Sequence, residues 1–242
     1  SLFLFNLNLS AEEFDISAKE VTIDNENQIL VGKGSVLAKD SEGKHIYANK
    51  ITYEKSKEFL LAEGDVKITD EDGNILKTDK ATYDKINEKI VTYNNTEVML
   101  KEGYKLVSKN ISYDIIKKIL NSSEKSIFTD LDKNIIETTM FQYDIKNNLF
   151  SSIGEIKIID LIKNKYFFKQ IHIDTKKKEM VGSDVSVLLN QKNFGLTKES
   201  DPRFVANDIF ISKNKTNLSK GVFTVCKKRD KQCPPWTLKA KK

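Results

Sequence analysis

Apolar and polar residues alternate along most of this chain, which is the pattern of a β-strand with one buried face. In FLLAEGDVKI, residues 59–68, the even-numbered positions are apolar or small, and positions 63, 65 and 67 are charged. Short polar segments such as DSEGK, DEDGN and KEGYK separate the strands and predict hairpin turns at Gly43, Gly73 and Gly103. Connections this short join antiparallel strands, because a parallel crossover needs about a dozen residues or more.

The alternating strands belong to a repeat with a period of 30 residues. At that interval the chain places Tyr53, Tyr83, Tyr113 and Tyr143. Three more columns are mostly aliphatic, and they contain Ile51, Ala81, Ile111 and Phe141; Leu60, Ile90, Leu120 and Phe150; and Ile46, Leu76, Leu106, Ile136 and Tyr166. The segment 204–212 matches 46–54 after an insertion of eight residues, and a further copy starts at Trp236. We therefore expect the chain to be a piece of a longer repeat protein.

Stacked two-strand repeats predict one elongated, all-β antiparallel sheet of about seven repeats, because each repeat buries its apolar face against the next. Gly34, Gly64 and Gly154 recur on the inner side. Glycine lets a strand bend or approach another backbone closely, so these positions predict a crease that folds the sheet into a V. The inside of the V is then apolar and the outside charged. The pattern alone leaves two alternatives: a structural repeat protein whose interior is filled by protein, or an interior open to a ligand.

The charge of the chain argues against a nucleic-acid partner. There are 40 Lys and Arg against 35 Asp and Glu, a net charge of +5, and the two signs are interspersed rather than gathered on one face. The mean hydropathy is −0.45, and nothing after the N-terminus is apolar enough to span a bilayer. Residues 1–11, SLFLFNLNLSA, are mostly apolar and end in small residues. They predict the remnant of an export signal, with an edge strand or a disordered start as the alternative.

Candidate catalytic chemistry is sparse. His45 and His172 are the two histidines, and neither stands in a Ser-His-Asp order or at a metal-ligand spacing. We expect His45 to be exposed beside a hairpin turn and His172 to point outward. Acidic turns such as DEDGN lack the glutamate at the twelfth position of a calcium loop. The sequence therefore predicts no enzyme, no metal and no cofactor, and a β-solenoid polysaccharide lyase is the enzymatic alternative.

Two cysteines, Cys226 and Cys233, stand in the segment CKKRDKQCPPW. A structural zinc site would need about four ligands, and no histidine lies near. In an exported protein, two cysteines are candidates for disulfides. They can pair with each other or with cysteines elsewhere in a longer protein, and the sequence does not choose between these pairings.

The repeat resembles the OstA-like family, the periplasmic β-jellyroll modules of the lipopolysaccharide-transport proteins LptA, LptC and LptD. The resemblance rests on IYANKITYE, LAEGDVKI and DEDGN and extends over residues 14–242. The tail, GVFTVC followed by CPPWTLKAKK, resembles the segment that joins the jellyroll to the outer-membrane barrel in the LptD branch. The implied organisation is an export-signal remnant over 1–11, jellyroll repeats over 12–225, and a linker with the start of a further repeat over 226–242.

The resemblance implies lipid transport rather than catalysis. In this family the sheet stays partly open, cradles the lipid A acyl chains of lipopolysaccharide in the periplasm, and delivers the lipid to the outer membrane. The implied lining consists of Ile51, Tyr53, Leu60, Ala81, Tyr83, Ile90, Ile111, Tyr113, Leu120, Phe141, Tyr143 and Phe150.

Family modules join by pairing edge strands. A docking edge for an LptA-type bridge protein is therefore expected at the N-terminal end, at Phe14, Ile16, Val21 and Ile23. The outer-membrane barrel and its plug lipoprotein are the other partners that the resemblance implies. A soluble LptA-like bridge is the alternative within the family.

Overall fold

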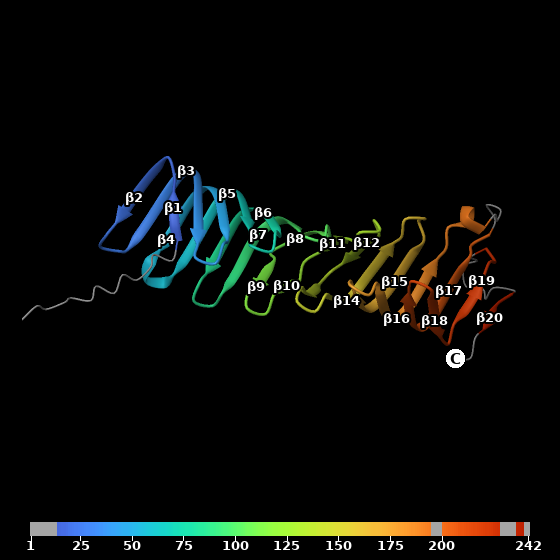
Figure 1. Cartoon of the computed structure of the whole chain (residues 1–242). Coiled ribbons are helices and arrows are strands. Elements are labelled where there is room, and N and C mark those ends of the chain that lie inside the picture. The colour runs from blue at the N-terminus through green and yellow to red at the C-terminus, as the bar shows by residue number, and fades with distance from the viewer. Residues whose placement is uncertain (1–13, 195–199, 228–235, 240–242) are drawn as a thin grey trace, which may run out of the picture.

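Antiparallel strands follow one another along the length of the molecule in the computed structural model (Figure 1). The structure describes residues 14–194, 200–227 and 236–239. The long strands are β3 (Ile29–Asp40), β4 (His45–Glu54), β5 (Phe59–Thr69), β6 (Ile75–Asp84), β7 (Lys89–Met99), β14 (Leu149–Ile159), β15 (Lys165–Asp174), β16 (Glu179–Leu188) and β17 (Arg203–Ser212). Neighbours in sequence pair in an antiparallel manner. The all-β, elongated antiparallel jellyroll predicted from the repeat is confirmed.

Shorter strands complete the two ends and the middle of the sheet. They are β1 (Phe14–Ser17), β2 (Glu20–Asp24), β8 (Lys105–Lys109), β9 (Ser112–Asp114), β10 (Ile119–Ser122), β11 (Ser126–Thr129), β12 (Ile135–Thr138), β13 (Phe141–Asp144), β18 (Lys215–Ser219), β19 (Val222–Thr224) and β20 (Leu238–Lys239). Two short 3-10 turns are η1 (Lys55–Lys57) and η2 (Gln191–Phe194). In the part of the chain that the structure describes, no helix has the length and apolar character needed to cross a bilayer.

A crease divides the sheet into two arms. The strand pairing shifts register there, between Lys33 and Val36 in β3 and at the matching places in later repeats. Gly34, Gly64 and Gly154 lie at the shift with φ of +77°, +76° and +111°. Side chains disfavour this left-handed region, and glycine enters it freely. The glycine column therefore marks the fold line, as the sequence predicts.

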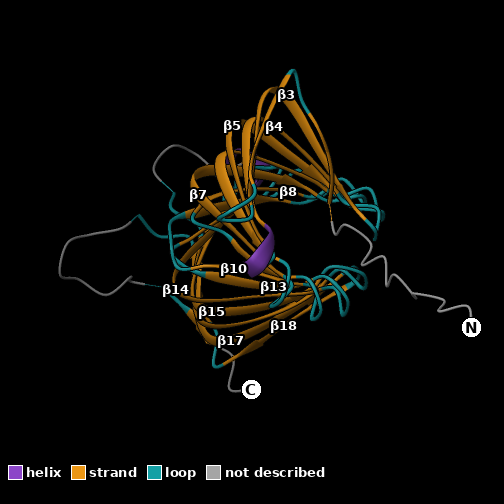
Figure 2. Cartoon of the chain, turned by 90° about the vertical axis from the view of Figure 1, so that its left-hand side faces the viewer, coloured by secondary structure: helices purple, strands orange, loops and turns teal. Residues whose placement is uncertain are grey.

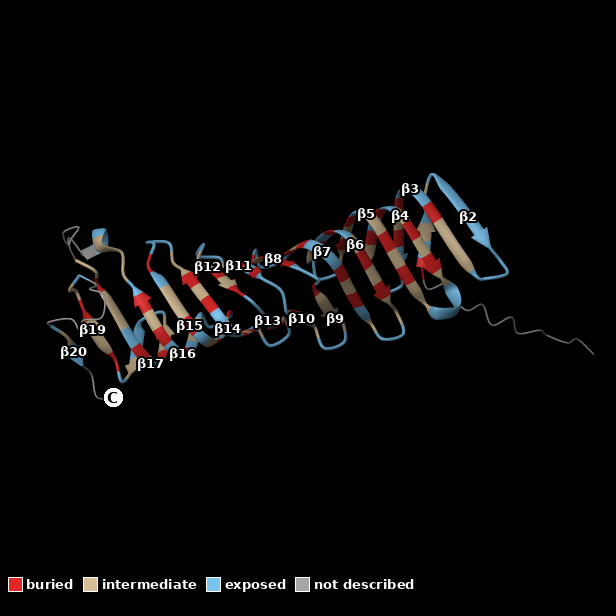
Figure 3. Ribbon diagram, turned by 180° about the vertical axis from the view of Figure 1, so that it is seen from behind, coloured by how far each residue is buried: buried red, intermediate tan, exposed pale blue. Residues whose placement is uncertain are grey.

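The two arms carry the turns that form the two rims of the V. Rim A consists of the turns 40–44, 70–74, 100–104, 130–134 and 160–164, and rim B of the turns 24–28, 54–58, 84–88, 114–118, 144–148 and 174–178. Figure 2, a view along the long axis, shows the strands stacked behind one another with the turns in rows at their ends. Buried positions alternate with more exposed ones along the strands (Figure 3).

Rim turns are stabilised by aspartate side chains. Asp70 accepts hydrogen bonds from the Asn74 backbone N–H and side-chain amide, both at 2.8 Å. The pairs Asp130–Asn134 and Asp160–Asn164 repeat this geometry. These carboxylates are thus engaged within their own turns, which accounts for the acidic turn sequences.

The arms part completely in the middle of the molecule. The strands break between β8 and β9, between β10 and β11, and between β12 and β13, while β7 and β14 span both arms and join them. The crease positions here are Asn94 and Glu124 instead of glycine. Serine and threonine hydroxyls line the break on the inside and are buried: Thr78, Thr92, Thr96, Ser108, Ser122, Ser126, Thr138 and Ser152.

These hydroxyls replace the hydrogen bonds that the broken ladder lacks. The Thr92 hydroxyl accepts from the Ile111 backbone N–H at 3.0 Å and is contacted by the Thr96 hydroxyl at 2.7 Å. The Ser122 hydroxyl donates to the Lys109 carbonyl at 2.7 Å. A buried backbone group without a partner is costly. The hydroxyl line is therefore what allows the crease to open without a loss of hydrogen bonds.

We expect Thr92→Val to lower the free energy of unfolding by about 1–3 kcal/mol. Valine keeps the shape of the threonine side chain but leaves the Ile111 backbone N–H without the hydroxyl that accepts its hydrogen bond. Urea denaturation followed by circular dichroism measures the change. Thr82→Val, on the more exposed face of β6, is the matched control and is expected to change stability by less than about 0.5 kcal/mol. Equal losses in the two variants would contradict a hydrogen-bonding role for Thr92.

Candidate functional site: an apolar groove with two cavities

The inner-face residues predicted from the repeat all lie inside the V. Eleven of the twelve are buried, and Tyr113 is half-buried. Their placement follows from the alternation of the strands, since Leu60 pairs with Tyr53 on one side and with Tyr83 on the other. Residues of one column thus lie beside each other from strand to strand. The columns form continuous apolar stripes along the molecule.

A first cavity of about 310 Å³ lies in the N-terminal half of the groove. Three of the twelve predicted lining residues reach it: Ile90, Tyr113 and Leu120. Its remaining walls are Ile68, Ile75, Leu76, Val98, Leu100, Ile115 and Ile145, with Glu42, Lys44, Asp70, Glu71, Asp72, Asn74 and Lys118 at the rims. The cavity is thus an apolar space with charged groups along its mouth.

A second cavity of about 600 Å³ lies in the C-terminal half. None of the twelve predicted residues lines it. Its walls include Phe128, Ile136, Ile158, Tyr166, Ile173, Met180 and Ile211, and its rim residues include Asp130, Asp132, Asn134, Lys178 and Lys213. Ile136 and Tyr166 belong to one of the apolar columns visible in the sequence. That column was therefore the sequence signal that these two residues face the groove.

An aromatic partition separates the two cavities. In the arm that carries rim A, Val98 of the first cavity pairs with Leu106, and Leu106 pairs with Phe128 of the second. In the arm that carries rim B, the corresponding order runs from Leu120 through Tyr143 and Phe150 to Ile173. The ring centroids of Phe128 and Phe150 are 4.9 Å apart, and those of Phe128 and Tyr143 are 5.9 Å apart. Side chains of the two arms thus meet here and fill the groove.

The partition reaches the mouth of the groove through Tyr104. This residue stands in rim A, stacks on Phe128 at 5.5 Å, and donates a hydrogen bond from its hydroxyl to the Thr175 carbonyl of rim B at 3.0 Å. The Thr175 hydroxyl lies 3.1 Å from the Tyr143 hydroxyl. The two rims are therefore held together directly above the partition.

The aromatic ring of Phe14 and a network of polar side chains close the N-terminal end of the groove. Phe14 packs edge-on against Tyr53 and Tyr83, with centroids 5.1 and 5.7 Å apart. Beside the Tyr83 ring, Lys44 contacts Asp40 at 3.0 Å and also pairs with Glu42. The Asp40 side chain is fully buried.

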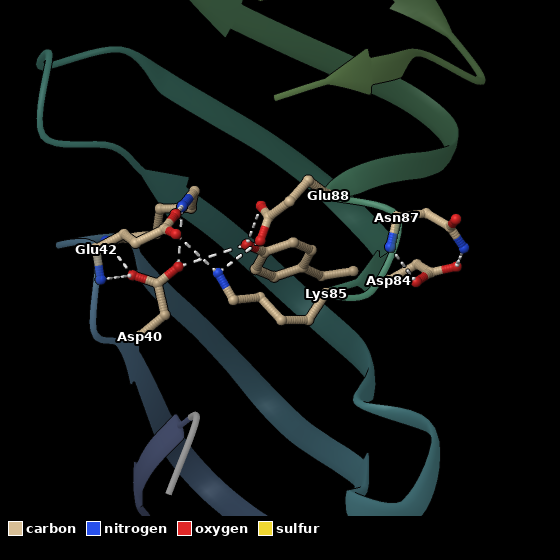
Figure 4. A network of polar contacts seen from close by, with 8 residues as sticks. Asp40, Glu42, Asp84, Lys85, Asn87 and Glu88 are labelled. Carbon is tan, nitrogen blue, oxygen red and sulfur yellow. Dashed lines mark hydrogen bonds and ion pairs between the residues drawn. The ribbon is translucent and has the colours of Figure 1, made fainter. Parts of the chain in front are cut away.

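The same network links the two rims. Lys85 of rim B contacts Glu88 at 2.6 Å and Glu42 of rim A at 3.2 Å (Figure 4). The Tyr83 hydroxyl donates to Glu88 at 2.9 Å, and burial together with this bond raises the pKa of Tyr83. Hydrogen bonds from Lys44 and Lys85 lower the pKa of the Glu42 carboxyl. This end of the groove is thus closed by several mutually supporting contacts.

Two single ion pairs cross the mouth above the cavities. Lys118 of rim B contacts Asp72 of rim A at 2.7 Å, and both residues line the first cavity. Lys178 of rim B contacts Asp132 of rim A at 2.7 Å, and both line the second cavity. The hydrogen bond between Lys118 and Asp72 lowers the pKa of the aspartate and raises that of the lysine. All four side chains remain 42–60% exposed.

A tyrosine lines each cavity, Tyr113 in the first and Tyr166 in the second. Burial, aided by nearby aspartates, raises the pKa of Tyr113 and of Tyr166 to about 12. Both phenols therefore stay neutral near pH 7. His172 lies exposed on the outer face, as the alternation predicts, with its Nδ1 2.9 Å from the Ser151 hydroxyl. His45 is half-buried rather than exposed, because its ring lies beside that of Tyr47.

The predicted docking edge consists of β1 and β2, which both pair with β3. Val21 and Ile23 are exposed by 47% and 58%, although they stand in columns that are buried elsewhere. Ile16 is half-buried, and the Phe14 side chain is buried in the groove. In the described part of the chain, no strand pairs with the outer edge of β2.

Two predicted features fall wholly or partly outside the described residues. The export-signal remnant over 1–11 lies outside them, as does Cys233. Cys226 is half-buried, with its Sγ 3.8 Å from the Trp236 carbonyl oxygen. The disulfide pairing therefore stays a prediction. Beyond it, β20 pairs with β19, with Leu238 opposite Phe223, so the sheet continues at this end.

The chain was compared with family models, curated proteins and solved structures. No family model matches the chain, and no curated protein matches it. Among solved structures, the chain is similar to LptH, the LptA-homologous periplasmic component of the conserved lipopolysaccharide transport device from Pseudomonas aeruginosa. The identity is 11%, the match covers 73% of this chain and 94% of LptH, and the TM-score is 0.24.

Proposed function

We propose that this chain is a periplasmic module that carries lipopolysaccharide, with the lipid A acyl chains held inside the V-shaped sheet. The observation that carries the proposal is the pair of apolar cavities, of about 310 and 600 Å³, inside the groove. Volumes of about 300–1,000 Å³ are typical of ligand sites. Burial of a methylene is worth about 0.8 kcal/mol, so a chain of about a dozen carbons gains on the order of 10 kcal/mol before entropy costs.

The proposed function includes no chemical reaction. The side chains that line the cavities are aliphatic or aromatic in the interior, and the charged groups stand at the rims. Such a site holds an alkyl chain out of water while a polar headgroup stays at the mouth. The resemblance of the repeats to OstA-like modules supports lipopolysaccharide as the amphiphile, since that family carries it.

The edge at β2 supports a docking role within this proposal. An unpaired strand is a template for strand addition by another sheet. Val21 and Ile23 are inner-face residues that lack a covering repeat, so an incoming module would extend both the sheet and its apolar stripe. We propose an LptA-type bridge protein as this partner. At the opposite end, the outer-membrane barrel and plug lipoprotein of the LptD branch are the proposed recipients.

A soluble LptA-like bridge is the second candidate. The edge of β2 that is unpaired in the described residues favours it as well, because a bridge module also joins its neighbours by pairing edge strands. Sedimentation at increasing concentration tests this: a soluble bridge is expected to form longer oligomers, whereas an LptD-type module is expected to stay monomeric without its partner.

A photo-crosslinking experiment tests the lipid-carrier proposal. With a benzophenone amino acid at Tyr113, which lines the first cavity, we expect an adduct with lipopolysaccharide. The same probe at Ser112, the preceding residue on β9, is the matched control and is expected to give none, because neighbouring side chains of a strand point to opposite faces. Adducts are measured by immunoblot against the lipid.

The same experiment distinguishes the lipid carrier from the alternative, a structural repeat protein with a packed interior. The aromatic partition favours that alternative at the centre of the groove, where side chains of the two arms are already in contact. A well-folded protein that gives no adduct at Tyr113, and none with a probe at Tyr166 in the second cavity, would overturn the carrier proposal. Equal adducts at Tyr113 and Ser112 would mean that the lipid contacts the outside of the sheet.

A further inference from the structure

The ion pairs across the mouth coincide with the cavities. Asp72 and Lys118 are 46 residues apart, as are Asp132 and Lys178, and the second pair lies two repeats after the first. The intermediate rim positions, Glu102 and Asn148, hold no such pair in the described structure, and Tyr104 closes the rims there instead. One lysine–aspartate contact thus crosses the mouth above each of the two cavities.

These two ion pairs are weak because their side chains are exposed to solvent. Their side chains are 42% and 47% exposed at Lys118–Asp72, and 53% and 60% exposed at Lys178–Asp132. An exposed ion pair contributes little to stability, so it can open at little cost. The rim contact at the N-terminal end differs, because the Lys85 side chain is only 10% exposed and is shared by Glu42 and Glu88.

Each lysine stands at the boundary between apolar space and water. Lys118 and Lys178 line the two cavities while their ammonium groups reach the opposite rim. An amphiphile with its alkyl chain in the cavity places its headgroup at the same boundary. Ammonium groups bind phosphate oxygens through charge-assisted hydrogen bonds, as they bind carboxylates.

We propose that Asp72–Lys118 and Asp132–Lys178 are exchangeable clasps: the anionic, phosphate-bearing headgroup of an amphiphile displaces the aspartate and takes the lysine as its partner. This inference rests on the proposed function, because it assumes that an alkyl chain occupies the cavity below. The aspartate holds the mouth closed over an empty cavity, and the phosphate opens it on entry. The lysine is paired in both states, and the released aspartate turns to water.

Binding of two probe amphiphiles to the full chain tests the clasps. Dodecyl phosphate carries the chain and the anion, and dodecyl maltoside carries the same chain with a neutral head. Isothermal titration below the micellar concentration of each gives the dissociation constants. We expect Lys118→Met/Lys178→Met to weaken dodecyl phosphate binding by about tenfold or more and to leave dodecyl maltoside binding unchanged or stronger.

Variants of the two aspartates give the decisive comparison with the lysine variants. Asp72→Asn/Asp132→Asn breaks the same two ion pairs but leaves the lysines free for phosphate, so we expect dodecyl phosphate to bind several-fold more tightly. Opposite effects of the two double variants cannot arise from a purely structural contact. Both variants should melt within a few degrees of the wild type, because exposed pairs contribute little stability.

Each other outcome has a distinct meaning. If both double variants shift dodecyl phosphate affinity in the same direction, or not at all, the clasp proposal fails while the carrier proposal survives. If neither amphiphile binds the wild type, the carrier proposal fails as well. Inorganic phosphate is expected to bind far more weakly than dodecyl phosphate; equal affinities would assign the lysines to free phosphate and overturn a lipid headgroup site.

Discussion

Phe128→Ala is expected to lower the free energy of unfolding by about 3–5 kcal/mol, the range for truncating a buried aromatic ring. The Phe128 side chain is 2% exposed and touches rings from both arms: Tyr104 at 5.5 Å, Phe150 at 4.9 Å and Tyr143 at 5.9 Å. Its loss removes the centre of the aromatic partition. Urea denaturation measures the change, with Phe167→Ala on the more exposed face of β15 as the control. A comparable loss in the control would contradict a special packing role for Phe128.

The same variant should change which alkyl chains the groove accepts. Because Phe128 and Tyr104 line the second cavity, we expect loss of the Phe128 ring to extend that cavity toward the first. A longer chain then gains about 0.8 kcal/mol for each further methylene that it buries. We therefore expect hexadecyl phosphate to gain affinity relative to dodecyl phosphate in Phe128→Ala, measured by titration calorimetry. Unchanged chain-length preference would mean that the surrounding rings collapse into the gap.

The strands and the crease were predictable because their causes are local. Alternation in a segment such as 59–68 decides which side chains face inward, and the preference of Gly64 for a positive φ decides where the strand bends. Both signals recur every 30 residues, so each copy reinforces the others. The location of a cavity has no such local cause. It depends on the sizes of side chains that meet from two arms, and every inner column is apolar.

One feature that positions the cavities, the aromatic partition, did carry a faint signal in the sequence. The columns that hold Phe128, Phe141 and Phe150 contain mainly aliphatic residues in the earlier repeats, and the change to aromatic residues marks the partition. The clasps were hidden because they join the two arms: Lys118 follows Asp72 by 46 residues, about one and a half repeats. A search for matches at the repeat period does not align such pairs.

The largest electrostatic effect on stability is expected from Asp40→Ala, at about 3–5 kcal/mol, since it removes the buried carboxylate that pairs with the buried Lys44 and leaves this lysine only the exposed Glu42. The Asp40 carboxylate accepts from the Glu42 and Lys44 backbone N–H groups at 2.9 and 2.8 Å and from the Lys44 ammonium at 3.0 Å. The Lys44 side chain is 9% exposed. Asp70→Ala, at the same position of the next repeat, is the control. There the partner is the neutral Asn74, so a loss of about 1–2 kcal/mol is expected.

A double variant separates the buried charge from the turn geometry. Asp40→Ala/Lys44→Met removes both ions and keeps an apolar side chain of similar length over Tyr83. Replacing both members of a buried pair is often nearly neutral, whereas removing one is not. We therefore expect the double variant to recover a large part of the stability lost in Asp40→Ala, as measured by urea denaturation. If it recovers none, the loss comes from the hydrogen bonds that shape the turn at 40–44, and the ion pair itself contributes little to closing this end of the groove.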